Sequence, residues 1–287
     1  MFAVFKHELR SYFHSFSTYL FCAFLLEFVG IGTVLYNIQS AIANFEYVLN
    51  FVGLGMAIIV PVLTMRVMAE ERKQGTDMLL YSLPLKPHQI ILGKYFALLL
   101  VFAIPMVVIA FYPPIFSMYG DVYLPTAYGS LFAFFIMNAA LIAIGMFVSS
   151  LTDSVALAAG ITIPILVLNY YMVTLASVVS TTAIGAFIAL LVCVAVLALI
   201  AWLLTKDQRF TAGVAIVGFL AVGIFALVDY SALEGLLPAI MEQLSLFDRF
   251  ANFVNGSFDL RAIVFYLSVI IFFLFLSGES MEKRRYN

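Results

Sequence analysis

Residues 92–112 read LGKYFALLLVFAIPMVVIAFY, an apolar stretch whose one charged side chain is Lys94. A helix needs about 20 residues to cross a hydrocarbon core roughly 30 Å thick. Stretches of this kind recur along the whole chain, which is 64% hydrophobic and 10% charged. The sequence therefore predicts an integral membrane protein built from transmembrane helices, because soluble domains rarely have this composition.

Eight segments have the length and composition of transmembrane spans, so the predicted fold is all-α and polytopic. The predicted spans are residues 17–36, 48–68, 92–112, 128–148, 155–176, 183–204, 210–229 and 262–278. An even number of spans places both termini on the same side of the membrane. We expect residues 1–287 to form a single transmembrane domain.

The positive-inside rule orients these spans, because Lys and Arg are retained on the cytoplasmic face. With the N-terminus inside, only Arg249 and Arg261 of the 14 Lys and Arg residues lie outside. The inside residues are Lys6, Arg10, Arg66, Arg72, Lys73, Lys86, Lys94, Lys206, Arg209, Lys283, Arg284 and Arg285. We therefore expect both termini in the cytoplasm and a multi-pass protein of the plasma membrane, in bacteria the inner membrane.

The sequence carries no recognisable catalytic or metal-binding motif. A phosphate-binding loop needs Gly-Lys-Ser/Thr after a glycine-rich turn, and residues 92–95 lack both the hydroxyl and the leading glycine. The histidines His7, His14 and His88 are too scattered to indicate a metal site. We expect no catalytic residue and no metal in this chain. The net charge of -2, without a basic patch, argues against a nucleic-acid partner.

The first 16 residues predict an amphipathic helix that lies in the membrane interface. At 100° per residue, the aromatic and aliphatic side chains share one arc of the helix and the polar side chains lie across from it. The apolar arc comprises Phe2, Phe5, Leu9, Tyr12, Phe13 and Phe16, and the polar arc Lys6, His7, Arg10, Ser11 and His14. The alternative is that these residues simply begin the first span.

Residues 70–91 form a charged loop between the second and third predicted spans. Gly75-Thr76 predicts the start of a short helix, with Thr76 as its cap and Asp77 in its first turn. Pro84 ends this helix, whose apolar edge consists of Leu79, Leu80 and Leu83. Leucines exposed to the cytoplasm need cover from a partner or the bilayer. An ordinary charged loop is the alternative interpretation.

Two stretches resemble one family of membrane proteins. Residues 70–95, EERKQGTDMLLYSLPLKPHQIILGKY, resemble the loop before the third span of ABC-2 type transporter permeases. The shared pattern is a charged cluster, Gly-Thr, an acidic residue, a leucine pair, a proline stop and Ile-Leu-Gly-Lys. Residues 245–286, SLFDRFANFVNGSFDLRAIVFYLSVIIFFLFLSGESMEKRRY, resemble the last external segment and final span of the subgroup associated with gliding motility.

The resemblance implies the membrane subunit of an ATP-driven exporter. Such a permease pairs with a second copy or a related permease and with two cytosolic ATPase subunits, which bind ATP and Mg, so this chain needs no cofactor of its own. The loop helix would sit in a cleft of the ATPase and transmit its movement. The coupling residues carried over by position are Glu70, Glu71, Arg72, Lys73, Gly75, Thr76, Asp77, Leu79 and Leu80.

The chain departs from the six spans that are usual in this family, because residues 183–204 and 210–229 have no counterpart in shorter members. Two other functional classes stay open. One is an ion-coupled secondary transporter, which often shows inverted repeats with broken helices. The other is a membrane scaffold that moves no substrate. The transported substrate cannot be read from the sequence.

Three polar side chains within predicted spans are candidates for the translocation path. Glu27 stands near the middle of the first span, where a carboxylate is costly unless it meets a polar partner, water or a subunit interface. Asn138 and Asn169 could line the path, although hydrogen bonding between helices is the favoured interpretation.

Residues 231–261, on the external side, are too long and too apolar for a plain connector. Ile240, Leu244, Phe247 and Val254 repeat at helical spacing and predict an amphipathic helix. The family resemblance implies an external gate that includes Ile240, Leu244 and Phe247. An interfacial helix without a gating role is equally compatible with this pattern.

Overall fold

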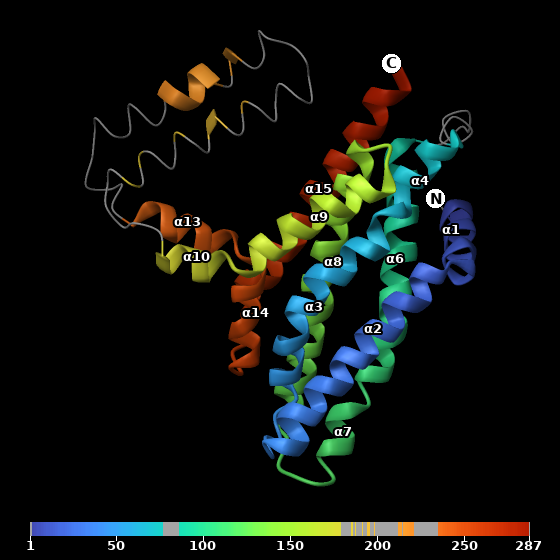
Figure 1. Cartoon of the computed structure of the whole chain (residues 1–287). Helices are drawn as coiled ribbons and strands as arrows, with labels where there is room; N and C mark the ends of the chain where they lie inside the picture. The colour runs from blue at the N-terminus through green and yellow to red at the C-terminus, as the bar shows by residue number, and fades with distance from the viewer. Residues whose placement is uncertain are drawn as a thin grey trace. The chain divides into compact units, whose positions relative to one another are not determined.

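The computed structural model describes residues 2–76, 86–178 and 235–286, together with a few helical residues between 185 and 220 (Figure 1). Every regular element in this part of the chain is a helix, as the sequence predicts. The chain divides into two compact units. Unit 1 comprises Met1–Tyr170 and Leu246–Asn287, and unit 2 comprises Tyr171–Ser245.

Unit 1 consists of long helices that pack side by side, together with several short ones (Figure 1). Its elements are α1 (Phe2–His14), α2 (Phe16–Gly32), the π-helix η1 (Thr33–Gln39), α3 (Glu46–Thr64), α4 (Arg66–Gln74), α6 (Pro87–Ile109), α7 (Tyr112–Phe116), α8 (Leu124–Leu151), α9 (Val155–Tyr170), α14 (Leu246–Val254) and α15 (Leu260–Tyr286). In unit 2, α10 (Met172–Val178) contacts α13 (Leu236–Leu244).

Five helical segments of the described residues are long and apolar enough to cross a membrane. They are Phe16–Gln39, Glu46–Gln74, Pro87–Phe116, Leu124–Leu151 and Leu260–Lys283, and each contains most of a predicted span. The predicted span 155–176 is interrupted at Tyr171 and counts as a sixth only if α9 and α10 form one broken span. The predicted spans 183–204 and 210–229 lie mostly outside the described residues. The total of eight therefore stays a prediction.

Unit 1 has two distinct ends. The N-terminus, α1, α4 and the C-terminal part of α15 lie at one end, which we call the terminal end, and α7 lies at the other, the opposite end (Figure 1). Both termini thus occupy one end of the helices, as an even number of crossings requires. The structure contains no membrane, so the predicted cytoplasmic location of this end stays a prediction.

Helix α1 is separate from α2, since the chain leaves the helical conformation at Ser15. It packs against α6 through a buried stripe of Val4, Glu8 and Tyr12. Phe2, which belongs to the predicted apolar arc, is 76% exposed. The break supports a distinct N-terminal helix, whereas its position in the membrane interface stays a prediction.

Helix α8 lies at the centre of unit 1 and packs against α3, α6, α9, α14 and α15. Its residues from Met137 to Met146 are all buried. At Gly145 the backbone of α8 comes so close to Thr64 of α3 that a Cβ atom there would overlap the Thr64 side chain. Glycine therefore permits the contact between α8 and α3 at this level of the unit.

Gly145→Ala should destabilise the protein by about 1–3 kcal/mol, because the added methyl group forces α3 and α8 apart. Gly160→Ala is the matched control, since a Cβ atom at Gly160 in α9 meets nothing within 4 Å. The measurement is the thermal unfolding midpoint in detergent, and equal midpoints for the two variants would contradict the close approach.

Candidate functional site

Helix α4 carries four of the nine predicted coupling residues, and its first turn is bonded to α8. The backbone N–H groups of Met68 and Ala69 both donate to the Ser149 hydroxyl oxygen at 3.2 Å. The same hydroxyl donates to the carbonyl of Met65 at 3.0 Å. The first N–H groups of a helix lack partners within it, so Ser149 satisfies donors that the break at Met65 leaves free.

A buried group of charges joins α4 to α1 and α6. The Lys94 ammonium on α6 lies 2.6 Å from Oε1 of Glu71 on α4 and 2.7 Å from Oε1 of Glu8 on α1. It also donates to the Val67 carbonyl at 3.3 Å. The Lys94 side chain is 0% exposed, so these three acceptors replace the water that its three N–H donors would otherwise bind. We call Glu8, Glu71 and Lys94 the charge cluster.

Tyr12 lies beside the charge cluster on the buried stripe of α1. Burial, followed by the negative charges of Glu8, Glu71 and Glu70, raises the pKa of Tyr12 well above its usual value of 10. Its buried hydroxyl has no hydrogen-bond partner among the described residues. The phenol therefore stays protonated over the physiological range, as a neutral group next to the two carboxylates.

The C-terminal end of α4 is formed by Gly75 and Thr76. Gly75 adopts a left-handed conformation with φ of 69°, and its N–H donates to the Arg72 carbonyl at 3.1 Å. The N–H and the hydroxyl of Thr76 both donate to the Glu71 carbonyl, at 3.0 and 3.2 Å. Gly75 and Thr76 therefore close α4. The short helix predicted after them lies outside the described residues from Asp77 on, so the role of Thr76 as its cap stays a prediction.

The other predicted coupling residues differ in their surroundings. Glu70 lies 4.0 Å from Arg66, and both side chains are about 40% exposed, so this pair contributes little to stability. Arg72 donates to the Thr152 carbonyl after α8 at 3.5 Å, and Lys73 is exposed. Asp77, Leu79 and Leu80 lie outside the described residues. Glu71 and Arg72 thus hold α4 in place, whereas Glu70 and Lys73 face outward.

Sequence reasoning missed Glu8 and Ser149 as parts of this site and considered Lys94 only as a flanking charge. The available signal was that a lysine within an apolar stretch needs a carboxylate partner. Nothing local in the sequence connects positions 8, 71, 94 and 149, because every pair of them is more than 20 residues apart.

The three predicted path residues do not share one environment. Glu27 is exposed on α2, whereas Asn138 is completely buried in α8 and donates to the Phe134 carbonyl of its own helix at 2.8 Å. The side-chain amide oxygen of Asn169 accepts the Leu246 N–H at 3.0 Å and thereby joins α9 to the start of α14. Asn169 therefore bonds to another element, as the favoured interpretation expects, and its role stays a prediction. Of the three path candidates, Glu27 is the one with an exposed side chain.

The predicted external helix is divided in two. Residues Leu236–Leu244 form α13 and Leu246–Val254 form α14, because Ser245 between them is extended. Ile240 and Leu244 belong to unit 2 and are exposed, whereas Phe247 is buried in unit 1. A single apolar face that includes these three residues is therefore wrong, and a gating role stays a prediction.

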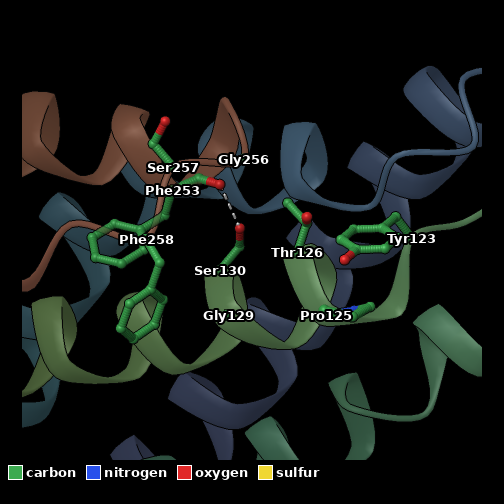
Figure 2. Close-up of a pocket in the computed structure, with 9 residues that line it drawn as sticks. All are labelled: Tyr123, Pro125, Thr126, Gly129, Ser130, Phe253, Gly256, Ser257 and Phe258. Atoms are coloured by element: carbon green, nitrogen blue, oxygen red, sulfur yellow. Dashed lines mark hydrogen bonds between the residues drawn. The ribbon is translucent and has the colours of Figure 1, made fainter.

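A pocket of about 270 Å³ lies at the opposite end of unit 1, between the start of α8 and the turn after α14 (Figure 2). Phe253 and Phe258 stand on one side of it and Tyr123 on the other. The Ser130 hydroxyl donates to the Phe253 carbonyl at 2.9 Å and ties α8 to α14. Aromatic rings and uncharged hydroxyls line the pocket, which contains no acid-base pair.

Comparison with known proteins places this sequence in a family. Residues 29–182 match the family model described as ABC-2 family transporter protein. The match covers more than half of the 287 residues. The chain belongs to the ABC-2 transporter family. A search of curated proteins found no match.

This ABC-2 permease is the membrane component of an ABC transporter and a multi-pass membrane protein. The family is one of transporter subunits that are not themselves catalytic, and it implies an ABC ATPase partner in general. The predicted resemblance to ABC-2 permeases is thereby confirmed. The matched residues contain α3, α4, α6, α8 and all of α9, so Glu71, Lys94 and Ser149 lie within the family region and Glu8 lies before it.

Lys94→Met should destabilise the protein by about 3–5 kcal/mol, because it leaves Glu8 and Glu71 without the cation that offsets their burial. Lys86→Met removes the same charge from an exposed position before α6 and serves as the control. Thermal unfolding of the purified permease in detergent measures both effects. A shift for Lys94→Met no larger than that of the control would show that the charge cluster does not hold α1, α4 and α6 together.

Proposed function

We propose that this permease is the membrane subunit of an ATP-driven exporter, powered by two separate cytosolic ATPase subunits. ATP and Mg bind in those subunits, and their closure drives the permeases between inward-facing and outward-facing states. The observation that carries the proposal is the position of α4 in a member of the ABC-2 family. Its described end, Gly75-Thr76, leads into the segment with the leucine pair Leu79 and Leu80.

The contacts of α4 make it suited to transmit force. It continues from α3, so that Glu46–Gln74 forms one long segment. The Ser149 hydroxyl, the Arg72 contact and the charge cluster attach α4 to α8, α6 and α1. A displacement at the C-terminal end of α4 would therefore reach three other helices. In this proposal Glu70, Lys73, Asp77, Leu79 and Leu80 contact the ATPase, whereas Glu71 and Arg72 pass its motion inward.

The proposed orientation puts the terminal end in the cytoplasm of a plasma membrane, in bacteria the inner membrane. Two facts support it, namely that both termini lie at the end that carries α4 and that Lys and Arg are concentrated there in the sequence. A second copy or a related permease would complete the membrane part. Membership in the gliding-motility subgroup is a further part of the proposal and rests on residues 245–286.

Replacing both loop leucines by aspartate should remove the ATPase from the purified complex, because charges at Leu79 and Leu80 oppose docking in an apolar cleft. The experiment isolates the full-length permease in mild detergent from its native source and quantifies the ATPase that elutes with it. A near-stoichiometric ATPase with the wild type and its loss with the double variant are expected.

The matched control for the loop variants is Leu244→Asp, which places the same charge on an exposed leucine of α13. We expect this control to retain the ATPase. A wild-type permease that elutes without any ATPase would contradict the proposed exporter and favour a secondary transporter or a scaffold. Loss of the ATPase in the control as well would show that the loop leucines are not the specific contact.

Glu27→Gln should lower ATP turnover of the assembled transporter several-fold, because an ionisable group near the middle of a span acts on a water-filled path or a subunit interface. The Glu27 side chain is exposed on α2 although the surrounding face is apolar. Glu282→Gln, in an exposed position near the end of α15, is the control. Unchanged turnover with normal ATPase binding would remove Glu27 from the mechanism.

A further inference from the structure

An apolar hollow of about 450 Å³ lies between α1, α6 and α8 in unit 1. Four phenylalanine side chains line it, namely Phe2 and Phe5 of α1, Phe96 of α6 and Phe135 of α8. Phe2 and Phe5 stack with their ring centroids 6.1 Å apart. The remaining lining residues are aliphatic or glycine, so the hollow offers almost no hydrogen-bonding group to an occupant.

The dimensions of the hollow match one leaflet of a bilayer. Its lining on α6 extends from Gly93 to Ala103, which is about 15 Å at 1.5 Å per residue. Half of a hydrocarbon core roughly 30 Å thick is also about 15 Å. Ala103 lies near the middle of the candidate span Pro87–Phe116, so the hollow begins near the terminal end and stops close to the centre of the span. An acyl chain of the adjacent leaflet fits this depth.

Helix α1 places positive charge beside the hollow. Viewed along the axis of α1, the Lys6 and Arg10 side chains lie within about 80° of Phe2, and both are exposed. Glu8, the one acid of α1, faces the other way and is engaged by Lys94. The edge of α1 next to the hollow is therefore cationic. Basic amphipathic helices in the interface attract anionic lipids in the same manner.

We propose that the hollow between α1, α6 and α8 binds an anionic phospholipid, with an acyl chain against Phe96 and the headgroup on Lys6 and Arg10. The proposal needs the membrane location of unit 1 but neither the exporter mechanism nor the ATPase. Charge complementarity selects a phospholipid over a second copy of the chain, because an apolar protein helix in the hollow would leave Lys6 and Arg10 without an anionic partner.

Tryptophan quenching by brominated lipids tests this site directly. The chain has one tryptophan, Trp202, so Trp202→Phe gives a background without tryptophan fluorescence. Phe96→Trp places a reporter in the hollow, and Leu267→Trp places one on the exposed surface of α15 as the control. Each full-length variant is reconstituted in vesicles with brominated phosphatidylglycerol or brominated phosphatidylcholine. The ratio of the two quenching constants measures lipid selectivity at each reporter.

At the Phe96→Trp reporter, the quenching constant should be several-fold larger for brominated phosphatidylglycerol than for brominated phosphatidylcholine. At the Leu267→Trp reporter, the ratio of the two quenching constants should be near one. Adding Lys6→Gln and Arg10→Gln should abolish the preference at Phe96→Trp, whereas Lys86→Gln should leave it unchanged. Leu100→Trp, in the same hollow, provides a second reporter if Phe96→Trp disturbs folding, which size-exclusion chromatography monitors.

Three results would overturn the proposal. Equal ratios at the hollow and at the control would show that no selective site exists. A preference that survives loss of Lys6 and Arg10 would remove the headgroup contact. A reporter that neither lipid quenches would show that protein fills the hollow, either a second copy or another part of this chain. ATPase co-purification is measured separately, so lipid selectivity can fail while the exporter proposal stands.

Discussion

The ion pairs of Lys94 are the interaction on which the terminal end of unit 1 depends. Burying a lysine away from water costs free energy unless each of its three N–H donors has an acceptor. Here the acceptors come from Glu8, Glu71 and Val67. These residues belong to α1 and α4, so satisfying one ammonium group fixes two helices on a third. Loss of any partner leaves a buried charge unpaired, which ties the positions of all three helices together.

Helix α8 provides the surface against which α3 and α4 are held. Gly145 allows α3 to approach closely, and Ser149 bonds the backbone of α4 immediately beyond the break at Met65. The junction between α3 and α4 is thus bonded on one side by α8 and, through Glu71, on another side by α6. In the proposed exporter, this junction would connect the membrane spans to the ATPase.

Helix α1 has two faces with different surroundings. One face carries Glu8 and Tyr12 and packs against α6, while the edge beside it lines the apolar hollow and leads to Lys6 and Arg10. A lipid in the hollow would therefore bear on the same helix that supplies Glu8 to the charge cluster. Helix α1 would thereby connect a bound lipid to the α4 junction, although α1 precedes the residues that match the family.

The fold class, five of the spans, the separate N-terminal helix and the family could be predicted from the sequence, because span length, hydropathy and the loop motif are local properties. The sequence also pointed to α4 through its charges. The closure of α4 by Gly75 and Thr76, the division of the external segment at Ser245 and the bond from Asn169 to the start of α14 became known from the folded structure. The ion pairs of Lys94 with Glu8 and Glu71 likewise became known from the tertiary structure. Such pairings depend on which helices lie side by side, and spacing along the chain carries no information about that.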